Sequence, residues 1–253
     1  MKKVFFLIIL FLAGYCKSQD IVLSTKDSLY SYRIKDEQDL SFIRINLAIK
    51  NVSGSTVGFV LDTKSLGVYE SPNSYIFDEN TIPESGIYEN VFSPRIILFD
   101  TQTANPLKLD FYGKDIQYTE EGLAKIINKK KEIEKKEIAE LKKYKRIFFP
   151  KKNLKFIEKA MYINTHFTTL KPHEIKNITL LFNPQNYKHE GKFNGIGFLL
   201  EKDKKYDFVI KIHTERETTM KYLDSKNIKL IKKENIKIIS EDVFSQKLQL
   251  VAQ

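Results

Sequence analysis

Few side chains in this sequence are of types that could take part in catalysis or bind a metal, and their spacing matches none of the common catalytic motifs. The four histidines are His166, His173, His189 and His213. None lies three or four residues from another, and none has a carboxylate at metalloprotease spacing, so the zinc-protease pattern is missing. Because His213 continues a predicted strand, we interpret it as a surface or edge residue and not as a metal ligand.

Motifs for nucleophilic catalysis and phosphate binding are also missing. The sequence has no G-x-S-x-G elbow, no glycine-rich phosphate loop and no calcium loop. A glycosidase-type pair of carboxylates converges only in space, so a hydrolase stays open as an alternative, although no tryptophan is present to form a sugar platform. We therefore predict no catalytic residue, no cofactor and no metal.

The only cysteine, Cys16, lies in an N-terminal segment that is typical of a secretory signal peptide. Two lysines precede an unbroken apolar run over residues 4–13, which is shorter than the roughly 20 residues of a membrane-spanning helix. Cys16 and Ser18 supply small residues before a cleavage site, which predicts a signal peptide over residues 1–18 and a mature start at Gln19. The alternatives are an uncleaved anchor helix and lipidation of Cys16.

The segment before Cys16, Leu12-Ala13-Gly14-Tyr15, resembles the lipobox of bacterial lipoproteins. It departs from that pattern at Tyr15, where the family has Gly, Ala or Ser. Cleavage after Ser18 would leave a mature chain without a thiol, which excludes a cysteine nucleophile, a cysteine zinc site and a redox pair. The expected location is outside the cytoplasm: in the periplasm, at the outer surface or secreted.

The charge balance argues against a nucleic-acid partner. The chain carries 42 basic and 32 acidic residues, and only five of the basic residues are arginine, scattered along the sequence. Nucleic-acid readers depend on arginine for bidentate contacts to phosphates and bases. We expect at most a weak attraction to anionic envelope polymers or lipids.

Two regions show the alternation of buried strands. Ile43, Ile45, Leu47 and Ile49 alternate with polar residues; after the turn over residues 51–55, Val57, Phe59 and Leu61 alternate in the same way, which predicts a hairpin-like pair. A second region follows a turn at 170–174, with alternation over residues 178–182. Residues 96–99 and 206–212 predict further strands. In the lysine-rich tail, the apolar pairs Ile228/Leu230 and Ile236/Ile238 predict at least one last strand, and residues 245–251 form either a final strand or a frayed end.

These regions resemble bacterial exported immunoglobulin-like sandwich proteins of unknown function. The resemblance rests on an early strand ending in Asn-x-Ser (residues 40–62), and on the Leu-Lys-Pro-His-Glu turn before the later strand. There His173 stands in place of the usual glycine. Tyr206, which opens a strand after a charged corner, is interpreted either as a tyrosine corner or as an ordinary strand residue.

One long helix is predicted over residues 119–146, with Thr119 near its start and Pro150 beyond its end. Its apolar side chains share one face and lysines line the other. Either this stripe packs on the sandwich, or it docks on a partner or an anionic surface. The candidate docking residues are Ile126, Ile133, Leu141, Phe148, Phe149, Lys151 and Lys152.

We thus expect a mainly β chain: an immunoglobulin-like antiparallel β-sandwich forming one domain over residues 19–253, with strand groups over 21–118 and 156–253 and one long inserted amphipathic helix. The expected function is a non-enzymatic, exported binding or assembly module of the bacterial envelope, whose partner is another envelope protein or polymer. The alternatives are a proteinase-inhibitor-like module presenting residues 71–94, and the hydrolase. Membrane contact is expected only at the surface or through lipidated Cys16.

Overall fold

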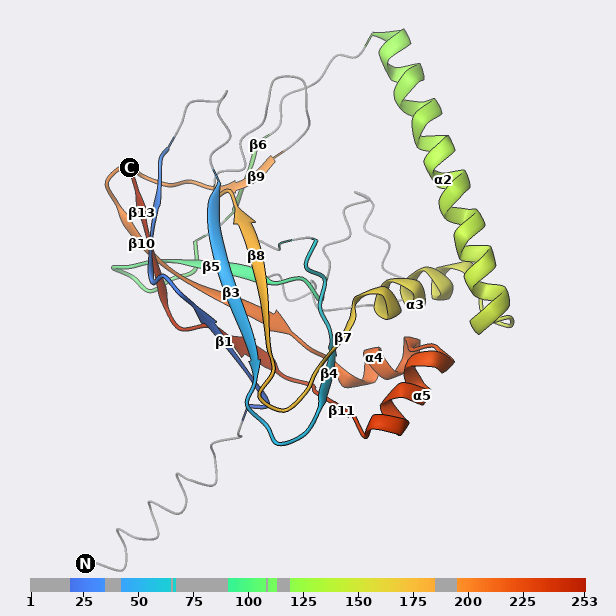
Figure 1. Ribbon diagram of the computed structural model, residues 1–253. Coiled ribbons are helices and arrows are strands. Elements are labelled where there is room, and N and C mark those ends of the chain that lie inside the picture. Colours follow the sequence, from blue (N-terminus) through green and yellow to red (C-terminus); the bar gives the residue numbers. More distant parts are fainter. Residues whose placement is uncertain are drawn as a thin grey trace, which may run out of the picture.

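The computed structural model describes residues 19–34, 42–64, 66, 91–107, 109–112, 119–184 and 195–253 (Figure 1). In these residues, helices and strands take about equal shares. The prediction of a mainly β chain is therefore confirmed only in part: antiparallel sheets and a long helix are present, but the chain is mixed α and β. The predicted signal peptide, with Cys16, lies outside the described residues.

The first sheet contains β1 (Ile21–Thr25), β3 (Ile43–Asn51) and β8 (Ile175–Phe182), all antiparallel, with β3 in the centre. Its register pairs Ile45 with Leu180 and Leu47 with Ile178. The predicted alternation of β3 is confirmed, because its isoleucine and leucine side chains are buried and its charged ones are exposed.

The second sheet is built around β10 (Lys205–His213). On one side of β10 lies β5 (Arg95–Asp100), and on the other lie β12 (Asp242–Phe244) and β13 (Leu248–Ala252), both antiparallel to β10. The outer strand, β2 (Leu29–Tyr32), runs parallel to β13. Ser245, between β12 and β13, continues the pairing with β10. Its backbone amide donates to the carbonyl of Ile210, and its hydroxyl accepts from the Ile210 amide.

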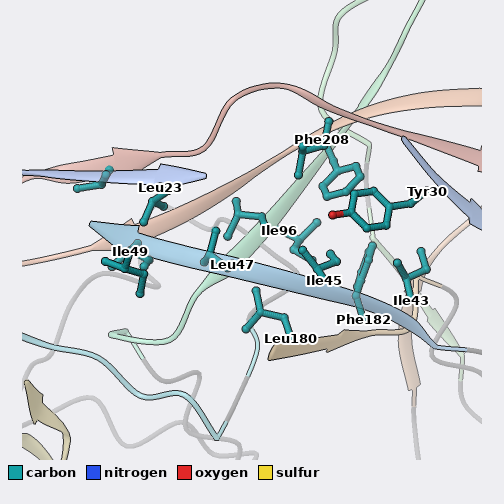
Figure 2. Packing of buried hydrophobic residues seen from close by; sticks show 14 of the residues in the cluster. Leu23, Tyr30, Ile43, Ile45, Leu47, Ile49, Ile96, Leu180, Phe182 and Phe208 are labelled. Carbon is teal, nitrogen blue, oxygen red and sulfur yellow. The ribbon is translucent and has the colours of Figure 1, made fainter. Parts of the chain in front are cut away.

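The two sheets face each other across the main hydrophobic core. Figure 2 shows Leu47 and Phe182 from the first sheet pointing toward Ile96 and Phe208 from the second. Tyr30 joins them, with its ring centroid 5.7 Å from that of Phe208. Each fully buried side chain of this size stabilises the fold by roughly 1.5–3 kcal/mol, so this interface is the main source of stability of the sheets.

The predicted hairpin between residues 43–49 and 57–61 does not form. After β3 the chain passes to a small third sheet, in which strand β4 (Val57–Val60) pairs with β7 (Phe167–Leu170) and β11 (Lys237–Ile238). Buried Asn51 explains the change of sheet, because its side-chain amide donates to the carbonyls of Ser55, Leu170 and Lys171 at 2.8, 3.0 and 2.9 Å. It thereby holds the turn after β3 against the turn after β7.

Two further features of the strand region were predicted. The turn before β8 is confirmed, and His173 takes a left-handed conformation there (φ 64°), the backbone state in which glycine is more usual. The predicted final strand is also confirmed, by β13. A separate pair, β6 (Leu109–Tyr112) with β9 (Gly195–Phe198), completes the described strands.

Four helices are described: α2 (Glu120–Phe148), α3 (Leu154–His166), α4 (Arg216–Tyr222) and α5 (Ser225–Glu234). Only α2 was predicted, with bounds within two residues of those found. The pair Ile228 and Leu230, which suggested a strand, lies in α5. That helix starts because Asp224 caps it, its carboxylate accepting from the Asn227 amide at 2.9 Å. Helices α3, α4 and α5 form a layer beside the sheets (Figure 1). A second hydrophobic core lies here, to which Val60 of β4 and Phe92 also contribute.

Candidate functional site

Helix α2 and the turn after it carry all the docking residues predicted from the sequence. The helix begins after Thr119, whose hydroxyl accepts a hydrogen bond from the backbone amide of Gly122 at 3.2 Å. Acidic residues occupy its first turn and basic residues its last turn, which complements the helix dipole at both ends. The chain cannot extend the helix simply beyond Phe149 because Pro150 lacks a backbone amide hydrogen.

The N-terminal two thirds of α2 exposes its apolar stripe to solvent. The five aliphatic side chains of this part are 42–47% exposed: Leu123, Ile126, Ile127, Ile133 and Ile138. We call these five residues the exposed stripe. No residue of α2 is buried, and Figure 1 shows the helix standing away from the sheets, with only its C-terminal end near α3. The interpretation that the apolar face packs on the sandwich is therefore wrong for this part of the helix.

Three of the predicted docking residues lie instead where α2 is anchored. Leu141, Phe148 and Phe149 are half-buried, and Leu141 and Phe149 pack on the second core. Aromatic rings continue from α2 into α3: Tyr144 lies 4.7 Å from Phe148, and Phe149 lies 5.4 Å from Phe156, between ring centroids. These contacts fix the base of the helix to the protein.

Polar contacts strengthen this anchor. The Tyr144 hydroxyl donates to the Asp224 carboxylate at 3.0 Å, and burial together with this hydrogen bond raises the pKa of Tyr144. Asn164 of α3 accepts hydrogen bonds from the backbone amide of Asp224 and from the side chain of Asn227, both at 2.9 Å. One network thus ties α2 to α3 and to the start of α5.

The predicted docking lysines, Lys151 and Lys152, lie in the exposed turn between α2 and α3. The ammonium group of Lys152 lies 4.7 Å from the centroid of the Phe156 ring, a cation–π contact. The predicted docking residues therefore divide into two groups. Ile126 and Ile133 lie on the exposed stripe, and the others lie at the base of the helix.

Charged residues interrupt the exposed stripe near its middle. Lys130 and Glu134 form an i,i+4 ion pair at 4.0 Å, with side chains 77% and 53% exposed. At 3.6 residues per turn, Lys130, Glu134 and Glu137 all point along the same direction as the apolar side chains. The stripe is thus apolar at both ends and carries both signs of charge between them.

A buried polar cluster that the sequence did not predict joins α3 to the sheets. The Tyr162 hydroxyl donates to the buried Asp62 carboxylate at 3.2 Å, and Nδ1 of His166 lies 3.6 Å from the other carboxylate oxygen. Burial lowers the pKa of His166, with Asp62 acting in the opposite direction, and burial raises the pKa of Tyr162. The cluster fastens the C-terminal end of α3 beside β4.

A second histidine is also paired with a carboxylate. Nδ1 of His213 lies 2.6 Å from the Asp242 carboxylate, which also accepts from the ammonium group of buried Lys211 at 2.9 Å. Burial raises the pKa of Asp242, but the hydrogen bonds from His213 and Lys211 outweigh it and leave the pKa below its usual value. His213 thus lies at the end of β10, the central strand of its sheet, half-buried in a cross-strand contact with Asp242, and not at a sheet edge as predicted.

Among the described residues, no three histidine, cysteine, aspartate or glutamate side chains gather closely enough to bind a metal ion. None of the described helices is both long enough and apolar enough to cross a membrane. Of residues 71–94, which the inhibitor alternative would present, only 91–94 are described.

Comparison with protein-family models and with curated sequences identified no relative. The chain matches no model of a known protein family, and no curated protein is significantly similar to it in sequence. Function therefore has to be inferred from the fold and from the surface of α2.

Proposed function

We propose that this protein is an exported, non-enzymatic binding or assembly module in which an immunoglobulin-like sandwich carries helix α2 as its binding element. Strand order supports the sandwich. The sheet β1–β3–β8 corresponds to strands A, B and E of that fold, and β5, β10 and β12/β13 correspond to strands C, F and G.

Tyr206 gives independent support for this fold. It lies near the start of β10, in the position of strand F, and its side chain is buried. Its hydroxyl accepts a hydrogen bond from the backbone amide of Glu201 at 2.8 Å, five residues upstream. This geometry is that of a tyrosine corner, in which the ring is buried and the hydroxyl bonds to nearby upstream backbone.

The exposed stripe of α2 is the observation that carries the binding function. Single exposed apolar residues are common, but a row of five along one helix face costs solvation free energy and marks interaction surfaces. The base of the same helix is anchored through aromatic packing and the Tyr144–Asp224 hydrogen bond. A helix whose base is anchored and whose N-terminal part exposes an apolar stripe is suited to present that stripe to a partner.

The partner surface is best matched by another amphipathic helix. Such a helix contributes aliphatic side chains to the ends of the stripe, and it also contributes charges that pair with Lys130 and Glu134 in the middle. A flat apolar surface would bury those charges and supply no partner for either, which costs several kcal/mol per ion even after relaxation.

The non-enzymatic part of the proposal is supported by the roles of the buried polar groups. Asn51 holds two turns together, Asp62 fastens α3, and Asp224 caps α5 while it accepts from Tyr144. Each group is already used in holding elements of the fold. Export is proposed from the signal-peptide pattern of residues 1–18.

Site-specific photo-crosslinking in envelopes of the source cell tests the proposal. A photoreactive amino acid replaces Ile133, on the stripe, or Ala139, on the opposite face of the same helix. We expect covalent adducts from position 133 and few from position 139. The Ile126→Glu substitution should remove the adducts from position 133 and leave the thermal unfolding midpoint unchanged. Equal labelling from both positions, or none from position 133, would contradict the proposal.

A further inference from the structure

We propose that the helix which docks on the exposed stripe is α2 of a second copy of this chain, running antiparallel to the first. This inference rests on the proposed function, since it names the partner of the same surface. It commits the protein to a two-fold symmetric dimer, in which the stripe of each copy covers that of the other.

The charges at the ends of α2 favour an antiparallel pair. The first turn contains Glu120 and Glu121, and the last turn contains Lys145 and Arg146. In an antiparallel pair, the acidic end of one helix lies along the basic end of the other, at both ends of the interface. A parallel pair would place like charges side by side and would also align the helix dipoles unfavourably.

The charges in the middle select a register. By two-fold symmetry, a register that places Lys130 of one copy beside Glu134 of the other makes this contact twice, so the ion pair now formed within each helix is exchanged between helices. The same register brings Glu120 of one copy, three residues before Leu123 on the stripe side of the helix, level to within one residue with Lys145 of the other. Middle and end charges therefore agree on one alignment.

The apolar residues agree with this alignment as well. It places Ile126 opposite Ile138 of the other copy, again twice, and Leu123 opposite Leu141, whose side chain is already half-buried against the second core. Ile126 and Ile138 are 46% and 43% exposed in the single chain, so both have surface left to bury. Two layers are imperfect, because Ile127 faces Glu137 and Ile133 falls level with Lys131.

The size of the interface sets its expected strength. Residues 120–144 overlap in this alignment and span about 36 Å of helix. One pair of helices over that length buries less area than the roughly 1,200–2,000 Å² of stable, specific interfaces. The two imperfect layers weaken the pair further. We therefore expect a reversible dimer with a dissociation constant in the micromolar range or weaker.

A membrane surface fits the stripe less well than a second copy does. Lysines on the opposite face would favour anionic lipids, but Glu134 and Glu137 lie in the middle of the apolar face, where an interfacial helix buries its side chains. In the dimer, Glu134 is instead paired with Lys130.

Sedimentation equilibrium of the mature protein tests the dimer. From about 1 µM to about 200 µM, the average mass should rise from that of one chain toward that of two. The double variant Ile126→Glu/Ile138→Glu places glutamates opposite each other, and we expect its dimerisation constant to weaken by roughly tenfold or more. Ala139→Glu makes a similar change on the opposite face and should leave the constant unchanged.

Zero-length carbodiimide crosslinking tests the orientation. Glu120 and Lys145 lie about 38 Å apart along one helix, too far for a direct amide bond within a single chain. In the antiparallel dimer they are neighbours, so mass spectrometry of the crosslinked dimer should find peptides joining them.

Three outcomes would overturn the inference: a monomer at every concentration, a dimer that the double variant does not weaken, or a dimer whose crosslinks exclude Glu120–Lys145. Its failure can be told apart from failure of the proposed function. A monomer that still forms adducts with a different protein from position 133 would refute self-pairing and leave the binding function standing. A monomer that binds vesicles of anionic phospholipid through the stripe would refute both.

Discussion

Two chemically identical substitutions, Ile133→Ala and Ile163→Ala, should have very different effects on stability. Ile163 lies in α3 and is fully buried, whereas Ile133 lies on the stripe and is 47% exposed. Both positions are inside helices, so differences in backbone conformation are small. The comparison isolates the packing of each side chain against the rest of the protein.

The magnitudes follow from burial. Truncating Ile163 removes three buried carbons and leaves a cavity, which costs about 2–5 kcal/mol of unfolding free energy. At position 133 the covered half of the side chain is shielded mainly by its own helix. The loss there is small, and alanine regains about 0.4 kcal/mol through its higher helix propensity. We therefore expect a change within about 0.5 kcal/mol at position 133.

Urea unfolding measures both effects. Circular dichroism follows the helices, and tyrosine fluorescence follows the cores, since the chain contains 13 tyrosines and no tryptophan. An unchanged m-value would show that a shift in the unfolding midpoint reflects a change in stability. A cost above about 2 kcal/mol for Ile133→Ala would refute our reasoning, because it would mean that the stripe is covered within the single chain.

Three further predictions concern the sheets and their junctions. Asn51→Ala leaves buried carbonyls without donors and should cost about 2–4 kcal/mol by urea unfolding, against under about 1 kcal/mol for Ser53→Ala. The hydrogen bond from Lys204 lowers the pKa of Asp100 to about 2 and raises that of Lys204 to about 12. Unfolding free energy should therefore decline as pH falls from 3.8 toward 2 and as it rises from 10.5 toward 12, and both declines should weaken in Lys204→Met. Burial lowers the pKa of His166, so stability should also decline as pH falls below 6.5, and His166→Gln should show less of this decline in pH-dependent thermal melts.

The sequence contained enough information for the strands and for the long helix. Alternation over residues 43–49 predicted β3 because one face of that strand is buried and the other is solvated. Thr119 and Pro150 fixed the ends of α2 to within two residues. Local chemistry decides such features, so they can be read without knowledge of the fold.

Helix α3 was missed although its signals were local. Asn153 caps it, accepting from the Phe156 amide at 2.8 Å, and buried residues follow at helical spacing: Phe156, Ile157, Ala160 and Ile163. The expectation of a strand group over 156–253 took precedence over that spacing. Long-range pairing partners could not be predicted, because no sequence pattern indicates that the Asn51 side chain donates to the carbonyl of Leu170, 119 residues away.

The direction of the α2 stripe could not be read from the sequence either. An amphipathic helix has the same pattern whether its apolar face meets its own core or a partner. What decides the matter is the position of the anchor, and the hydrogen bond from Tyr144 to Asp224 joins residues 80 apart. The sequence identified the docking helix, and only the fold separated its exposed part from its base.

Hydroxyl-radical footprinting at low and high protein concentration tests the central claim most directly. In the dilute protein, Ile126 and Ile133 should be oxidised readily, while buried Ile163 stays unreactive. As the protein associates, oxidation of Ile126 should fall and that of Ile163 should not change. Protection of Ile126 and Ile133 already in the dilute monomer would contradict the account, because the stripe would then belong to the fold and not to a binding surface.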